Sequence, residues 1–169
     1  SFATSYIPTT SSTSTRNADV CNNSGSAQDF NDSEGVLYAE IAALADSLTR
    51  RVISISDGST NEKAQIAYLN VSNQIKAFII SGGTSTTLIA NLTDITDFVK
   101  VALKYKSGDY ALWVDGIEVQ TETNAFTPSG LNSLQFDNGS GGDDFYGKVK
   151  SVAVFKEALT DEQLEKLTS

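Results

Sequence analysis

The stretch FVKVALKYKSGDYALWVDGIEV, residues 98–119, decides the fold class of this chain. Apolar residues alternate with other residues on both sides of a short loop at 106–109, which predicts two antiparallel strands over 97–105 and 109–115. The alternation also sorts the side chains into two faces. The face that we expect to form the core carries Val101, Leu103, Tyr105, Tyr110, Leu112 and Val114, and the opposite face carries Lys100, Ala102, Lys104, Ala111 and Trp113.

Turn sequences and further apolar runs extend this pattern along the chain. The pair Asp115-Gly116 favours a two-residue type I′ turn, in which both central residues take positive φ. The further strands that the runs predict span 36–44, 51–56, 63–71, 74–80, 86–92, 131–136 and 146–155. Short strands at such regular spacing are typical of a sandwich or barrel. We therefore predict an all-β fold, a two-sheet antiparallel β-sandwich, as a single domain over residues 1–169.

The end of the chain, EALTDEQLEKLTS, has a helical pattern instead. Thr160 followed by Gln163 matches a capping box, which predicts a short C-terminal helix over 160–168. Leu164 and Leu167 share one face of this helix because they lie three residues apart. We expect that face to dock on the sandwich and to close an open end of its core.

The composition excludes several classes of function. With a net charge of -9 the chain lacks the basic surface that nucleic-acid binding requires. It has no histidine, which removes the commonest general base and zinc ligand. Cys21 has no partner for an internal disulfide, and no apolar run is long enough for a membrane span. The first residue is not Met, so we expect a module of a longer protein, with a loop-rich extended segment over 1–33 packed on or leading into the sandwich.

Several stretches together resemble the concanavalin A-like lectin/glucanase superfamily, in its laminin-G-like branch. Residues 98–119 are similar to the branch's strand and Asp-Gly hairpin, and FYGKVKSVAVFKEALTDEQLEKL (145–167) is similar to its ending. SYIPTTSSTSTRNADV (5–20) and RRVISISDGSTNEK (50–63) resemble versions of the domain in bacteriophage tail and fibre proteins. The resemblance implies a jelly roll with one concave sheet, whose groove or rim loops often bind glycans, sometimes with Ca²⁺. It also implies an extracellular or virion-surface location.

Two groups of residues are candidates for ligand binding. Trp113, beside Lys104, lies on the face opposite the core, where an open indole could stack on a sugar ring. Ser54, Ser56 and Gln65 fall opposite core positions in their own strands, and we expect them to join Trp113 on the concave face. The alternatives are that Trp113 is covered and merely packs, and that the polar residues form an ordinary solvated sheet face.

The loop DNGSGGDD, residues 137–144, is a candidate cation site. Asp137, Asn138, Asp143 and Asp144 supply oxygen atoms around flexible glycines, a composition that suits Ca²⁺. The spacing does not match an EF-hand loop. The alternative is a solvated hairpin loop without a metal.

The residues give little support to an enzyme. Glucanases of the superfamily carry a Glu-x-Asp-x-x-Glu strand, whereas here Glu40 is followed by Ala42 in place of the Asp, without a second Glu. We therefore predict a non-catalytic carbohydrate-binding module that recognises a polysaccharide or cell-surface glycan, within a phage or secreted protein. One alternative is a structural or assembly domain of a phage virion that contacts other virion or host-surface proteins. Another is a divergent glycoside hydrolase or polysaccharide lyase.

Overall fold

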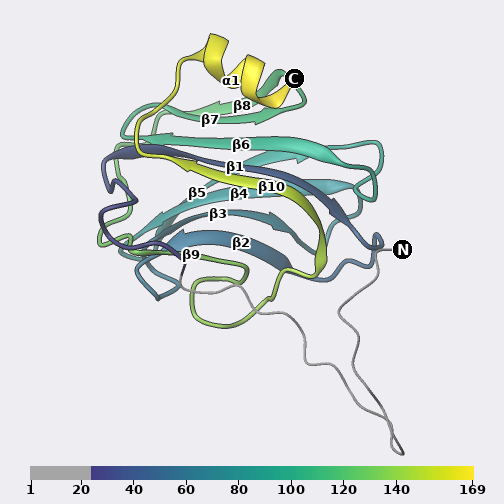
Figure 1. The fold of residues 1–169 in the computed structure, drawn as a ribbon, viewed down its shortest axis with the longest axis horizontal. Helices are drawn as coiled ribbons and strands as arrows, with labels where there is room; N and C mark the ends of the chain where they lie inside the picture. Colours follow the sequence, from purple (N-terminus) through teal and green to yellow (C-terminus); the bar gives the residue numbers. More distant parts are fainter. Residues whose placement is uncertain (1–23) are drawn as a thin grey trace, which may run out of the picture.

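The computed structural model describes residues 24–169 and confirms the two-sheet antiparallel sandwich (Figure 1). In sheet A the strands lie in the order β5 (Thr84–Asn91), β4 (Gln74–Ser81), β3 (Lys63–Tyr68), β2 (Arg51–Ser56) and β9 (Ser133–Gln135). In sheet B the order is β10 (Gly147–Phe155), β1 (Glu34–Ala43), β6 (Val99–Lys106), β7 (Tyr110–Val114) and β8 (Ile117–Glu122). The predicted strands over 63–71 and 131–136 are shorter in the structure than in the sequence pattern.

The β6–β7 hairpin has the predicted faces. Val101 lies opposite Val114, and Ala102 lies opposite Trp113. The turn is also as predicted, because Asp115 and Gly116 have φ angles of 46° and 80°. The residues between the two sheets form one apolar core, which includes Ile53, Ile55, Ile66, Ile75, Ile79, Leu88, Val101, Leu103, Tyr105, Tyr110, Leu112 and Val114.

Helix α1 (Asp161–Thr168) begins at the predicted capping box, in which the Thr160 side chain accepts a hydrogen bond from the Gln163 amide. Its position differs from the expectation. Leu164 is fully buried, but it packs on the face of sheet B that is turned away from sheet A, and not on an end of the core. Figure 1 shows the yellow helix above β7 and β8. We call such a face, turned away from the other sheet, an outer face.

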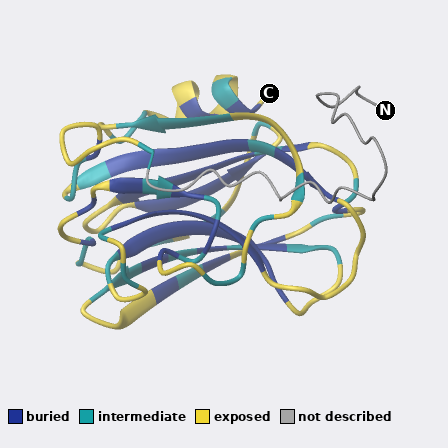
Figure 2. Cartoon of the chain, turned by 60° about the horizontal axis from the view of Figure 1, so that its bottom comes forward, coloured by how far each residue is buried: buried dark blue, intermediate teal, exposed yellow. Residues whose placement is uncertain are grey.

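The outer face of sheet A is covered over only part of its width. All residues of β2 and β3 are buried, whereas β4 and β5 alternate between buried and more open positions. The loop 137–144 accounts for much of this cover, and its Gly139 lies so close to the end of β2 that an added Cβ would stand 3.0 Å from Ser56 Oγ. Figure 2 shows buried residues along the strands of both sheets and exposed residues in the connecting loops.

Most of the segment predicted to be extended over 1–33, including Cys21, lies outside the described residues. Its described part precedes β1 and includes a bridge between Ser24 and Leu134 of β9. None of the helices over residues 24–169 has the length and apolar composition of a membrane span.

Candidate functional site

Trp113 does not offer an open face to a ligand. Its side chain is 7% exposed and packs with Val36, Tyr38 and Leu164 beneath helix α1. The small side chain of Ala102, directly across from Trp113, leaves room for the helix. The expectation of a sugar platform at this residue is therefore wrong, because the last helix of the chain occupies the position that a sugar would take.

Lys104 lies beside the apolar residues on which helix α1 packs. We call these residues the helix seat: Val36, Tyr38, Ala102, Ala111 and Trp113. The Lys104 ammonium lies 2.8 Å from a carboxylate oxygen of Asp109 and 3.4 Å from one of Asp161, in the first turn of α1. The lysine side chain is 6% exposed. Its charge is thus engaged by two carboxylates and connects the helix to the β6–β7 hairpin.

The structure splits the predicted ligand-binding set between two opposite sides of the molecule. Trp113 and Lys104 lie on the outer face of sheet B, whereas Ser54, Ser56 and Gln65 lie on the outer face of sheet A. The face of each residue was predicted correctly within its own strand. The association of the strands in one concave face was wrong, because alternation does not say which sheet a strand joins.

Ser54 and Ser56 instead meet the loop that was predicted as a cation site. The Ser54 hydroxyl donates to the Asp137 carbonyl at 2.8 Å, and the Ser56 hydroxyl donates to Gln135 Oε1 at 3.0 Å. The Lys63 ammonium donates to the Asn138 carbonyl at 2.7 Å. Two sets of residues that the sequence suggested separately thus form one polar layer on sheet A.

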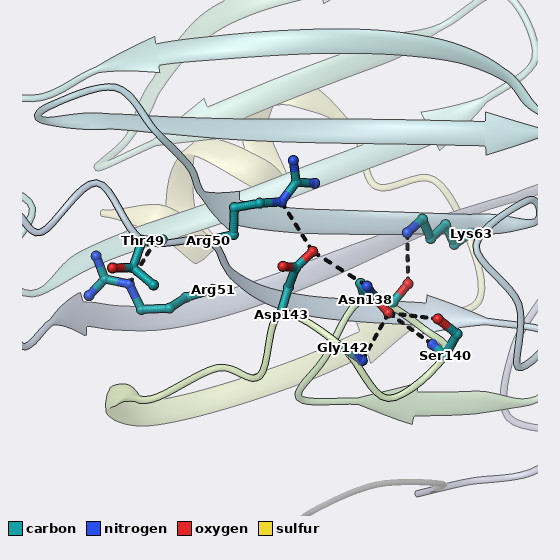
Figure 3. A network of polar contacts seen from close by, with 8 residues as sticks. All are labelled: Thr49, Arg50, Arg51, Lys63, Asn138, Ser140, Gly142 and Asp143. Carbon is teal, nitrogen blue, oxygen red and sulfur yellow. Dashed lines mark hydrogen bonds and ion pairs between the residues drawn. The ribbon is translucent and has the colours of Figure 1, made fainter.

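Figure 3 shows how this layer continues through the loop. Arg50 Nε lies 3.1 Å from Asp143 Oδ2, and Asn138 Oδ1 accepts hydrogen bonds from the amides of Ser140 and Gly142 at 3.1 and 3.2 Å. Burial, and then the nearby charge of Arg50, lowers the pKa of Lys63, while Asp143 acts in the opposite direction. The contacts hold the loop in a defined shape against β2 and β3.

Several side-chain oxygen atoms of loop 137–144 have partners within the protein. Asp137 Oδ1 accepts the Gly139 amide at 2.7 Å, Asp143 pairs with Arg50, and Asp144 is exposed. Over residues 24–169 there is no group of three or more His, Cys, Asp or Glu side chains that could hold a metal ion. Hydrogen-bond donors and Arg50 thus occupy one oxygen atom each of Asp137, Asn138 and Asp143, whereas the buried Asp137 Oδ2 has no hydrogen-bond partner among the described residues.

The more open half of sheet A carries a cluster of which only Gln65 was predicted from the sequence. Phe78 on β4 is half-buried and lies across from Gln65 on β3 and from Thr87 on β5. Two residues earlier on the same face, Lys76 lies across from Ile89. We call these residues, Gln65, Lys76, Phe78, Thr87 and Ile89, the β4 surface.

Gln65 is the buried member of the β4 surface. The residue is 3% exposed, and its Oε1 has no hydrogen-bond partner within the described part of the chain. The sequence signal for this surface was present in QIKAFII, where Lys76 and Phe78 alternate with the core residues Ile75, Ala77 and Ile79.

The architecture is that of a lectin-type jelly roll, with two antiparallel sheets and a short helix at the end of the chain. A family model described as the concanavalin A-like lectin/glucanases superfamily matches residues 12–165. The chain therefore belongs to this superfamily. No curated protein matches its sequence.

Solved structures share the fold at low sequence identity. A carbohydrate-binding domain, CBM40, of a Ruminococcus gnavus sialidase, solved with α2,3-sialyllactose bound, has a TM-score of 0.69 and 16% identity, over 90% of this chain and 96% of that chain. A leech intramolecular trans-sialidase has a TM-score of 0.66 and 18% identity, over 89% of this chain and 26% of that one. A heptameric SAP-like pentraxin from Limulus polyphemus has a TM-score of 0.67 and 13% identity, over 88% and 74%. At such identities the likeness establishes the fold.

Proposed function

We propose that this chain is a non-catalytic carbohydrate-binding domain that holds a glycan on the β4 surface. The observation that carries the proposal is the half-buried Phe78 on the more open half of sheet A, with the partly open Lys76 and Thr87 beside it. An aromatic face packs against the C–H side of a sugar ring, and a hydroxyl such as that of the neighbouring Thr87 forms hydrogen bonds with sugar hydroxyls. The likeness to a CBM40 domain solved with sialyllactose supports this class of ligand.

The proposal assigns no chemical step to the chain. Glu40, which belongs to the stretch that comes nearest to the glucanase motif in sequence, forms an ion pair with Lys150 at 2.8 Å. The proposal also includes no calcium, since Asp137 Oδ1, Asn138 Oδ1 and Asp143 Oδ2 already take part in hydrogen bonds or an ion pair within the protein. The resemblance of residues 5–20 and 50–63 to phage tail and fibre proteins supports a place in a phage or secreted protein, outside the cell or on a virion surface.

The test uses two partly exposed phenylalanines, of which only Phe78 belongs to the β4 surface. Phe78→Ala should weaken binding to a glycan selected from an array by about tenfold or more, because a buried aromatic contact contributes about 1.4 kcal/mol or more. Phe98→Ala is the matched control, since Phe98 is 38% exposed and lies outside sheet A. Equal affinity of both variants, or retention on no glycan at all, would refute the proposal.

A structural or assembly domain is the second candidate, and one region of the surface favours it. Ile117, Val119 and Phe98 are 64%, 40% and 38% exposed, and they line a pocket of about 350 Å³ between the ends of β5 and β8. Exposed apolar groups gathered in this way are typical of a protein contact. Light scattering after gel filtration distinguishes the candidates: this one predicts an oligomer that Ile117→Asp dissociates, with no glycan affinity.

A further inference from the structure

Charge is distributed unevenly between the two sheets. The chain has 21 acidic residues, yet none of them lies in the strands β2, β3, β4, β5 and β9 of sheet A. The same strands contain three of the 12 basic residues, Arg51, Lys63 and Lys76. In a chain with a net charge of -9, sheet A is therefore a locally basic region.

The three cations differ in whether they are free to meet a ligand. Arg51 is 1% exposed, and its guanidinium donates to the carbonyls of Thr49 and Ala45. Lys63 is 4% exposed and donates to a loop carbonyl. Lys76 is only half-buried and forms no ion pair with any described residue.

Lys76 also stands in the right place to act with the proposed aromatic platform. It lies two residues from Phe78 on β4, so both side chains project from the same face of the sheet, about 7 Å apart along the strand. Its neighbours across the sheet are Ala67 on β3 and Ile89 on β5, which are uncharged. The acidic residues of loop 137–144 lie over the opposite half of the sheet, where Arg50 neutralises Asp143.

We infer that the glycan recognised by the β4 surface is anionic, and that Lys76 binds its carboxylate or sulfate group while Phe78 packs against the adjoining ring. The inference rests on the proposed function and deepens it by naming the class of ligand. An unpaired ammonium beside an aromatic platform is complementary to a sugar that carries a negative charge next to an apolar ring face. The acidic remainder of the protein would repel such a ligand elsewhere.

Matched pairs of glycans test the inference directly. Binding of sialyllactose and lactose, and of polygalacturonate, heparin and neutral dextran, is measured by calorimetry and affinity electrophoresis. We expect retention of an anionic member without its neutral counterpart, and the carboxylate and sulfate probes identify which group is preferred. Lys76→Gln should weaken that binding about three- to tenfold, the range of a single charge-assisted contact, and the loss should shrink at high salt.

Lys148→Gln supplies the control, because it removes the same charge from an exposed position on β10 in sheet B. Unchanged affinity of this variant together with a weaker Lys76→Gln supports the inference. Neutral glycans that bind through Phe78 with no effect of Lys76→Gln would overturn the inference and leave the proposed function standing. Retention of no glycan by the unsubstituted protein would overturn both.

Discussion

The outer faces of the two sheets are covered in different ways. On sheet B, an apolar helix seat buries Trp113 and Leu164 and turns Lys104 toward acidic partners. On sheet A, a polar loop covers only β2 and β3, so that Phe78 and Lys76 stay half-buried. The aromatic residue most conspicuous in the sequence thus serves folding, whereas a less conspicuous one stands on the surface available to a ligand.

An aromatic residue on the face opposite the core can therefore indicate a binding surface only when no other segment of the chain covers it. Trp113 and Phe78 both lie on strands whose other face is core. The two residues differ because helix α1 covers Trp113 and does not cover Phe78. Substitutions under helix α1 and under the loop 137–144 test these two covers, and the largest expected loss in the free energy of unfolding comes first.

Loss of the apolar cover on sheet B should have the largest effect on stability. Leu164→Ala removes the fully buried side chain that seats α1, and we expect a loss of about 2–4 kcal/mol in the free energy of unfolding. Urea unfolding followed by circular dichroism measures it. Leu44→Ala is the control, because Leu44 is 60% exposed and its truncation should change little. Equal stability of the two variants would show that the burial of Leu164 does not stabilise the fold.

Loss of one polar contact under the loop on sheet A should cost less. Ser54→Ala removes the hydroxyl that donates to the buried Asp137 carbonyl, and we expect about 1–2 kcal/mol of destabilisation. The same unfolding measurement applies, with Ser85→Ala as control, since Ser85 is exposed on the same sheet. If the two serines behave alike, the loop does not depend on this contact.

The ion pair at the rim of the loop should matter least. Asp143→Asn keeps a residue that tolerates the positive φ of 56° while it removes the charge facing Arg50. We expect a loss of less than about 1 kcal/mol, because both side chains are partly exposed, and the loss should decrease in high salt. Asp144→Asn, at an exposed neighbouring position, should show neither effect. A salt-independent loss at Asp143 would point to packing instead of charge.

The sequence predicted what depends on neighbouring residues. Alternation placed Val101 and Leu112 in the core, Asp115-Gly116 gave the turn, and Thr160 with Gln163 gave the start of the helix, because each of these signals acts within a few residues. The superfamily was also identified correctly from the hairpin and the ending.

The site was less predictable because it depends on contacts between distant segments. The loop 137–144 meets Ser54 and Lys63 across more than seventy residues of sequence. Similarly, α1 reaches Trp113 only after the chain has completed both sheets. No local sequence pattern indicates which outer face the loop 137–144 or helix α1 will cover. This cover decides that Trp113 is buried and that Phe78 stays partly open.

The position of the only tryptophan also decides what its fluorescence can report. Trp113 lies beneath α1, on the side of the sandwich away from the β4 surface. Its emission should therefore shift to longer wavelength when the helix detaches, and should stay constant when a sugar binds. The molecule carries a built-in optical reporter of its last helix, and glycan titrations need a probe placed elsewhere.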